Sequence, residues 1–128
     1  MGLDMFAFRT NAKPSQPVDF MEEIQGADRN EIHYWRKHPD LHRFMEKLYR
    51  EKGGQAEDFN CVPVQLTEED LFGLEVYIKT TGLEQNQGGF FFGSSSRDEA
   101  QDAEDLQFIE DARQAIKEGD TVYYDSWW

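Results

Sequence analysis

The segment Thr121–Trp128 places large aromatic residues on both faces of a predicted strand, and this restricts the folds open to the chain. Successive side chains of a strand point to opposite faces, so Tyr124 and Trp128 share one face while Tyr123 and Trp127 share the other. Such a strand is either covered on both sides or has one face that contacts a ligand or partner, because Tyr and Trp are favoured interface anchors. The residues assigned to this candidate surface are Tyr124, Asp125, Trp127 and Trp128.

The beginning of the chain predicts a strand followed by a loop. Leu3–Thr10 has the alternating pattern of a strand, although both of its faces are partly apolar. Residues 11–30 contain two prolines and a glycine and predict a loop with one helical turn at Phe20–Ile24.

The next stretch, residues 30–52, predicts two helices separated at a proline. Pro39 lacks a backbone N–H and restricts the residue before it, so it cannot sit inside a helix without a break. We therefore expect a short helix near 30–37, a break at His38, and a second helix whose first residue is Pro39. Gly53-Gly54 then ends the second helix.

The second half of the chain predicts an edge strand and a well-marked helix start. Cys61–Leu66 has strand character, and Pro63 inside it favours an edge position. Thr67 begins a helix, since Asp70 occupies the position of the acidic partner in a capping box. Two further predicted elements are a short strand at Phe90–Phe92 and a helix near Asp102–Glu118.

These elements predict an α+β protein with about four short strands in a mixed sheet and three to four packed helices. A chain of 128 residues is expected to form a single domain over 1–128, with loop-rich segments at 11–30 and 83–101. The one cysteine, Cys61, excludes an internal disulfide framework and a multi-cysteine zinc site.

The formal net charge of -13 is unevenly distributed. Residues 1–56 contain nine acidic and nine basic residues, so residues 57–128 hold 17 of the 26 acidic and only four of the 13 basic ones. This balance argues against direct nucleic-acid binding and against anionic membrane surfaces. Because no apolar run approaches the about 20 residues that span a bilayer, we expect a cytoplasmic protein. The acidity either serves solubility or forms a face that meets a basic partner.

The most acidic part of the predicted C-terminal helix is the candidate face for such a partner. Electrostatic attraction of this kind mainly speeds and orients association. The residues of this predicted acidic face are Glu104, Asp105, Glu110, Asp111 and Glu118.

His38, His42 and Cys61 are the candidates for chemistry. The two histidines are four residues apart, which suits metal ligands on a continuous helix, but Pro39 interrupts it and the zinc-protease glutamate is missing. Local hydrogen bonding is the alternative, and we predict neither a metal nor a cofactor. Cys61 with a histidine is a candidate nucleophile and His42 a candidate acid or base, although a buried small hydrophobe is the commoner role of cysteine.

Two aromatic residues stand beside two basic ones just before His38. Such a run can stack on a base and neutralise a phosphate, or it can bury one aromatic ring beneath a basic face. The residues assigned to this candidate ligand or interface segment are Tyr34, Trp35, Arg36, Lys37 and His38, together with Asn60.

Several short motifs together resemble a family of small uncharacterised proteins of bacteriophages, prophages and bacteria. They are the opening Met1–Met5, the Tyr34–Lys37 run with Leu41-His42, the Asn60-Cys61 pair and the closing Tyr124–Trp128. The resemblance extends over the whole chain and is weakest at 11–28 and 83–100. It implies a phage or prophage origin, and it supplies no activity and no catalytic residues.

The sequence thus leaves two main functional hypotheses. The first is a non-enzymatic protein that acts through protein–protein contact with a basic partner. The alternative is a ligand-binding or catalytic domain whose pocket gathers Trp35, Arg36, His42, Asn60 and Cys61. The enzymatic status and the oligomeric state stay open at this point.

Overall fold

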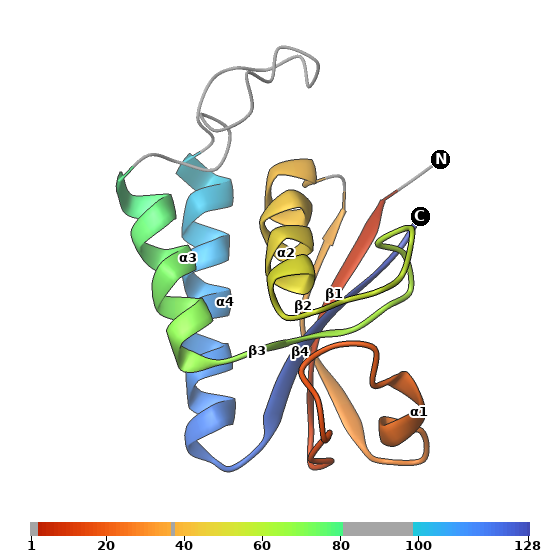
Figure 1. Ribbon diagram of the computed structural model, residues 1–128. Coiled ribbons are helices and arrows are strands. Elements are labelled where there is room, and N and C mark those ends of the chain that lie inside the picture. The colour runs from red at the N-terminus through yellow and green to blue at the C-terminus, as the bar shows by residue number, and fades with distance from the viewer. Residues whose placement is uncertain (1–2, 37, 81–98) are drawn as a thin grey trace.

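The computed structural model describes residues 3–36, 38–80 and 99–128 (Figure 1). The α+β class is confirmed, while the predicted strand at Phe90–Phe92 lies outside the described residues. The elements are β1 (Asp4–Thr10), α1 (Met21–Ile24), β2 (Arg29–Arg36), α2 (Pro39–Glu51), β3 (Val64–Leu66), α3 (Glu68–Thr80), α4 (Glu99–Lys117) and β4 (Thr121–Trp127).

The four strands form one sheet in the order β2-β1-β4-β3, and every neighbouring pair is antiparallel. The predicted mixed sheet is therefore wrong. The connection from β3 to β4 contains two helices, α3 and α4, that run in opposite directions (Figure 1). After two antiparallel helices the chain enters β4 in the direction opposite to β3. A single crossover helix would instead have made the two strands parallel.

The predicted helix near 30–37 is also wrong, because Arg29–Arg36 is strand β2. It pairs with β1 from Asp4↔Arg36 to Thr10↔Arg29, with one irregularity between Ala7 and Phe8. The segment contains Ile32, Tyr34 and Trp35, residue types that favour a pleated, half-buried strand. Pairing with β1 satisfies its backbone and buries Trp35, which is 3% exposed, while Tyr34 stays 42% exposed.

Helix α2 begins at Pro39, as predicted, and ends in a tight glycine turn. Gly53 adopts a φ of +98°, a left-handed conformation that glycine adopts without strain. Gly54 packs directly against the Tyr49 ring, so a Cβ at this position would overlap the ring. The turn therefore needs both glycines for different reasons.

The predicted capping box at the start of α3 is confirmed. The Thr67 N–H donates to Asp70 Oδ2 at 2.9 Å, and the Asp70 N–H donates to Thr67 Oγ1 at 3.2 Å. The predicted edge position of the preceding strand is confirmed, but the predicted bounds Cys61–Leu66 are wrong, because β3 covers only Val64–Leu66 and Pro63 lies just before it.

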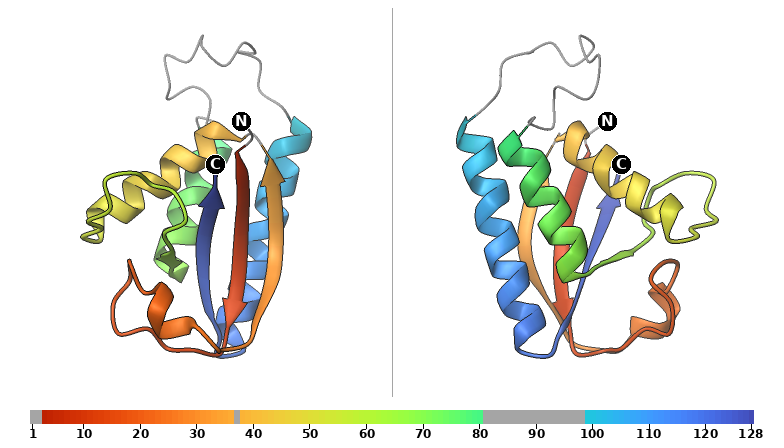
Figure 2. Two further views of the ribbon diagram at one scale, coloured as in Figure 1. Left: turned by 90° about the vertical axis from the view of Figure 1, so that its right-hand side faces the viewer. Right: turned by 60° about the vertical axis from the view of Figure 1, so that its left-hand side comes forward.

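Helices α2, α3 and α4 cover one face of the sheet, and α1 lies against part of the opposite face (Figure 2). Strand β4 is central, and Tyr123 and Tyr124 are both fully buried. The Tyr123 ring meets the edge of Phe20 at 5.7 Å, while Tyr124 stacks on Phe59 in the helix-side core. The prediction of a strand covered on both sides is thus confirmed for this part of β4.

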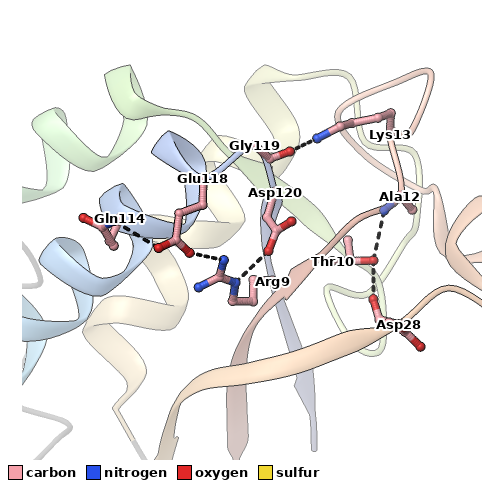
Figure 3. Close-up of polar contacts among 9 residues, drawn as sticks. All are labelled: Arg9, Thr10, Ala12, Lys13, Asp28, Gln114, Glu118, Gly119 and Asp120. Carbon is pink, nitrogen blue, oxygen red and sulfur yellow. Dashed lines mark hydrogen bonds and ion pairs between the residues drawn. The ribbon is translucent and has the colours of Figure 1, made fainter.

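The turn between α4 and β4 is fastened to β1 and the loop that follows it (Figure 3). The Arg9 guanidinium donates to Glu118 Oε1 at 2.5 Å and to Asp120 Oδ2 at 2.7 Å. The Lys13 ammonium donates to the carbonyl oxygen of Gly119. These contacts fix the register of two strands that are distant in sequence.

Candidate functional site

A cavity of about 460 Å³ opens between α2, the loop before β3 and the residue that follows β4. Its wall combines aromatic rings, three carboxylates and one guanidinium. The residues that line it are Leu3, Pro39, His42, Arg43, Glu46, Glu57, Asp58, Phe59 and Trp128.

The loop at residues 56–60 forms one side of the cavity and is held in place by α2. The Tyr49 hydroxyl donates to Asp19 Oδ1 at 2.5 Å and accepts the Ala56 N–H at 2.9 Å. The Arg50 guanidinium donates to the carbonyl oxygens of Ala56 and Glu57. These hydrogen bonds hold the backbone of the loop against α2, and side chains of the loop line the cavity.

The aromatic wall is fixed by hydrogen bonds between the two segments that carry it. The Asn60 side-chain amide donates to the Trp128 carbonyl oxygen and accepts the Trp128 N–H, each at 3.0 Å. The Trp128 indole N–H donates to the Phe59 carbonyl oxygen at 2.9 Å. Trp128 is 43% exposed and Phe59 only 2%, so one ring stands at the opening and the other at the floor.

His42 lines the cavity and is joined to β4 by a hydrogen bond of 2.7 Å between its Nδ1 and the Tyr124 hydroxyl. Burial, together with the nearby positive charge of Arg43, lowers the pKa of His42 to about 4. Burial also raises the pKa of Tyr124 well above its usual value. Both groups are therefore uncharged at neutral pH.

The opening of the cavity carries more negative than positive charge. Glu46 pairs with Arg50 at 3.6 Å. Within the parts of the chain that the structure describes, the side chains of Glu57 and Asp58 make no hydrogen bond or ion pair, and both residues are exposed. Among the described residues that line the cavity, Arg43 is the one with a positively charged side chain.

The predicted ligand residues Trp35 and His38 lie elsewhere, in a buried network with α4. The Trp35 indole N–H donates to Asp105 Oδ1, and His38 Nε2 contacts Asp105 Oδ2, both at 2.8 Å. Asp105 is 0% exposed, so its assignment to the acidic face is wrong. It falls at helical spacing from Phe108 and Ala112, which face the core, and this spacing is the sequence signal that identifies it as an inward residue.

Cys61 is exposed, with a φ of +60°, and its thiol is not activated. Its sulfur donates to Asn60 Oδ1 at 3.6 Å, while His42 bonds to Tyr124. Partial burial and the negative charge of Asp125 raise the pKa of Cys61. Since the thiolate is the reactive form, this environment disfavours nucleophilic chemistry.

Other predicted interface residues lie on the sheet face opposite the three helices. Tyr34 packs on Phe6 with ring centroids 5.3 Å apart, and its hydroxyl donates to Asp4 Oδ1. Trp127 is 66% exposed. Arg36 is exposed at the end of β2, and Lys37 lies outside the described residues.

The five residues of the predicted pocket are thus divided among separate places. Among them His42 lines the cavity, and Asn60 supports it by holding Trp128. The residues that sequence reasoning missed are the acidic pair Glu57-Asp58 before Phe59, and Glu46 four residues after His42. An i,i+4 spacing places His42 and Glu46 on one side of α2, and this signal was available.

The other four residues of the predicted acidic face, Glu104, Glu110, Asp111 and Glu118, are exposed, and each has a polar contact. His33 Nε2 lies 3.2 Å from Glu104, Arg113 pairs with Glu110 at 3.0 Å, and Arg9 pairs with Glu118. Asp111 accepts a hydrogen bond from Gln107. This helix face is therefore less strongly negative than its sequence predicts.

Within residues 3–36, 38–80 and 99–128, no group of three or more His, Cys, Asp or Glu side chains is placed to hold a metal ion. None of the described helices is both long and apolar enough to cross a membrane. Comparison with protein-family models, curated proteins and solved structures finds no match. The resemblance to phage and bacterial proteins stays a prediction.

Proposed function

We propose that this protein is a non-enzymatic binding protein that takes a lysine or arginine side chain of a basic partner into the His42 cavity. The observation that carries the proposal is the aromatic wall of Phe59 and Trp128 together with the carboxylates of Glu57 and Asp58, which have no polar partner among the described residues. A basic side chain has an apolar stem and a charged end. The aromatic rings of the wall can pack on the stem, and the carboxylates can pair with the charged end.

The charge of the cavity favours a cation. Glu57 and Asp58 oppose the charge of Arg43, Glu46 is paired with Arg50, and His42 adds no charge because its pKa is about 4. An anion entering the cavity would meet the uncompensated carboxylates. A cation would gain from them and from the aromatic faces, at about 0.5–2 kcal/mol for each ring contact.

The size of the cavity also fits a side chain or a small amine. Its volume of about 460 Å³ is within the range of small-ligand sites. Asn60 fixes the Trp128 backbone, and the Trp128 indole is bonded to Phe59, so little ordering is needed on binding. The acidity of residues 57–128 would attract the same partner over longer distance and be screened by salt.

The experiment measures binding of a short oligolysine peptide, an oligoarginine peptide and the blocked single amino acid N-acetyl-lysine amide by calorimetry at physiological salt. We expect E57Q/D58N to weaken peptide binding about tenfold, the effect of losing about 1.4 kcal/mol. W128A is expected to weaken both the peptides and the single amino acid.

Matched variants separate the cavity from general acidity. E110Q/D111N removes the same two charges from exposed positions of α4, and W127A removes a more exposed tryptophan from the other sheet face. Neither is expected to change affinity appreciably. Equal losses in E57Q/D58N and E110Q/D111N would overturn the proposal, because binding would then depend on net charge alone.

A further inference from the structure

Helix α3 carries a second apolar surface on the side that faces away from the core. Phe72 is 60% exposed and Val76 is 41% exposed, whereas Leu71, Leu74 and Ile78 are buried beneath the helix. In the right-hand view of Figure 2, α3 lies at the front of the helix layer, between α2 and α4. Exposed large apolar side chains grouped on one helix face are characteristic of an interaction surface.

The outer face of α3 has a charged residue at each end. Glu69, Phe72, Val76 and Lys79 follow at intervals of three, four and three, so they share one side of the helix, and Glu69 and Lys79 are also exposed. Their order is acidic, apolar, apolar and basic. We call these four residues the α3 seam.

We propose that the α3 seam binds the same seam of a second copy of this chain, with the two helices antiparallel. In one register, Glu69 of each copy lies opposite Lys79 of the other, and Phe72 lies opposite Val76. All four contacts are made at once about a twofold axis, which is the symmetry of an isologous dimer. A parallel pair would instead place like charges together at both ends, so the charges select the antiparallel arrangement.

Lys79 is paired within its own chain, but this pair is exposed enough for Lys79 to turn to Glu69 of a second copy. Its ammonium lies 3.2 Å from Glu75, and its side chain is 58% exposed. Glu75 also accepts a hydrogen bond from Arg113 at 2.8 Å, and this bond would keep Glu75 paired if Lys79 turned to the second copy.

Gly73 lies beside the seam and lets a second helix approach closely. Apart from its chain neighbours and the backbone of its own helix, no atom of the described residues lies within 4 Å of the position that a Cβ would take there, so packing among them does not require a glycine. The seam is a single helix face, smaller than the interface of a typical stable complex. We therefore expect a weak dimer whose population rises with protein concentration.

The test is sedimentation velocity on the full chain over a concentration series that reaches about 1 mM. The wild type is expected to show a reversible monomer–dimer equilibrium, and F72S to weaken it at least about tenfold. Circular dichroism checks that F72S stays folded, which its exposed position favours. A wild type that stays monomeric throughout the series would overturn the proposal.

Charge reversal gives a test that does not depend on removing apolar surface. E69K makes the chain less acidic and K79E makes it more acidic, yet each should weaken self-association because each puts like charges at both ends of the seam. Mixing the two variants should restore a dimer, now between unlike chains, because both ends are again complementary.

K117E is the matched control for K79E, since Lys117 is an exposed lysine in the last turn of a different helix, α4. It should leave self-association unchanged. If K117E weakened the dimer as much as K79E, or if the E69K and K79E mixture associated no better than either variant alone, the α3 seam would not be the interface.

Discussion

Two histidines near the start of α2 have opposite surroundings although they are four residues apart. His38 contacts the carboxylate of Asp105 in a closed network that also holds Trp35. His42 contacts the phenol of Tyr124 and lines an open cavity. The first network joins β2 to α4, whereas the second lies beside a surface that a ligand can reach. A buried polar contact therefore has a structural role at the first site, whereas at the second it lies beside the cavity for which we propose a binding role.

The largest expected difference between the two networks is in stability. D105A removes a fully buried carboxylate and leaves both the Trp35 indole N–H and His38 without their partner, at a cost of about 3 kcal/mol. Urea denaturation measures the loss. The control is D111A on the exposed side of α4, with an expected loss under about 0.5 kcal/mol. A loss below about 1 kcal/mol in D105A would mean that the closed network does not hold β2 to α4.

The sequence predicted local features of this comparison better than long-range ones. Pro39 and the Thr67–Asp70 capping box give correct helix starts because their signals act within a few residues. The helix predicted near 30–37 was wrong because the conformation of residues 29–36 depends on pairing with β1, which is distant in the sequence. The predicted mixed sheet was wrong because the relative direction of β3 and β4 depends on the antiparallel arrangement of α3 and α4 between them.

The candidate site was predicted only in fragments for the same reason. His42 and Asn60 were named, but the sequence could not show that Asn60 acts through Trp128, which is 68 residues later. Nor did local spacing separate Trp35 from the cavity, since its burial is decided by contact with Asp105 on α4. Side chains that share a cavity here come from segments that tertiary packing alone brings together.

The second difference is in pH dependence. The folded pKa of His42 is lowered to about 4 by burial and by Arg43, whereas the unfolded value is near 6.5. Between these values the unfolded chain binds more protons, so stability falls as the pH drops from about 6.5 toward 4. Linkage gives about 3 kcal/mol at most, and solvent screening of this half-buried ring reduces the expected loss to about 2 kcal/mol.

H42Q tests this dependence, because glutamine hydrogen-bonds without titrating. Urea denaturation at pH 7 and at pH 4 should show that the wild type loses about 2 kcal/mol more than H42Q over this interval. Acidic groups elsewhere in the fold contribute equally to both proteins and cancel in the comparison. Parallel pH profiles for the two proteins would contradict a neutral, buried His42.

The smallest effect is expected from the neutral bond of the second network. Y124F removes the hydroxyl that contacts His42 Nδ1 at 2.7 Å while keeping the buried ring, so about 1 kcal/mol of stability should be lost. This is less than in D105A because one uncharged pair is broken, and His42 can still reach water through the cavity. Urea denaturation of both variants under one set of conditions gives the ratio directly. Equal losses would show that the phenol network is as closed as the carboxylate network, which would remove the physical distinction between the two histidines.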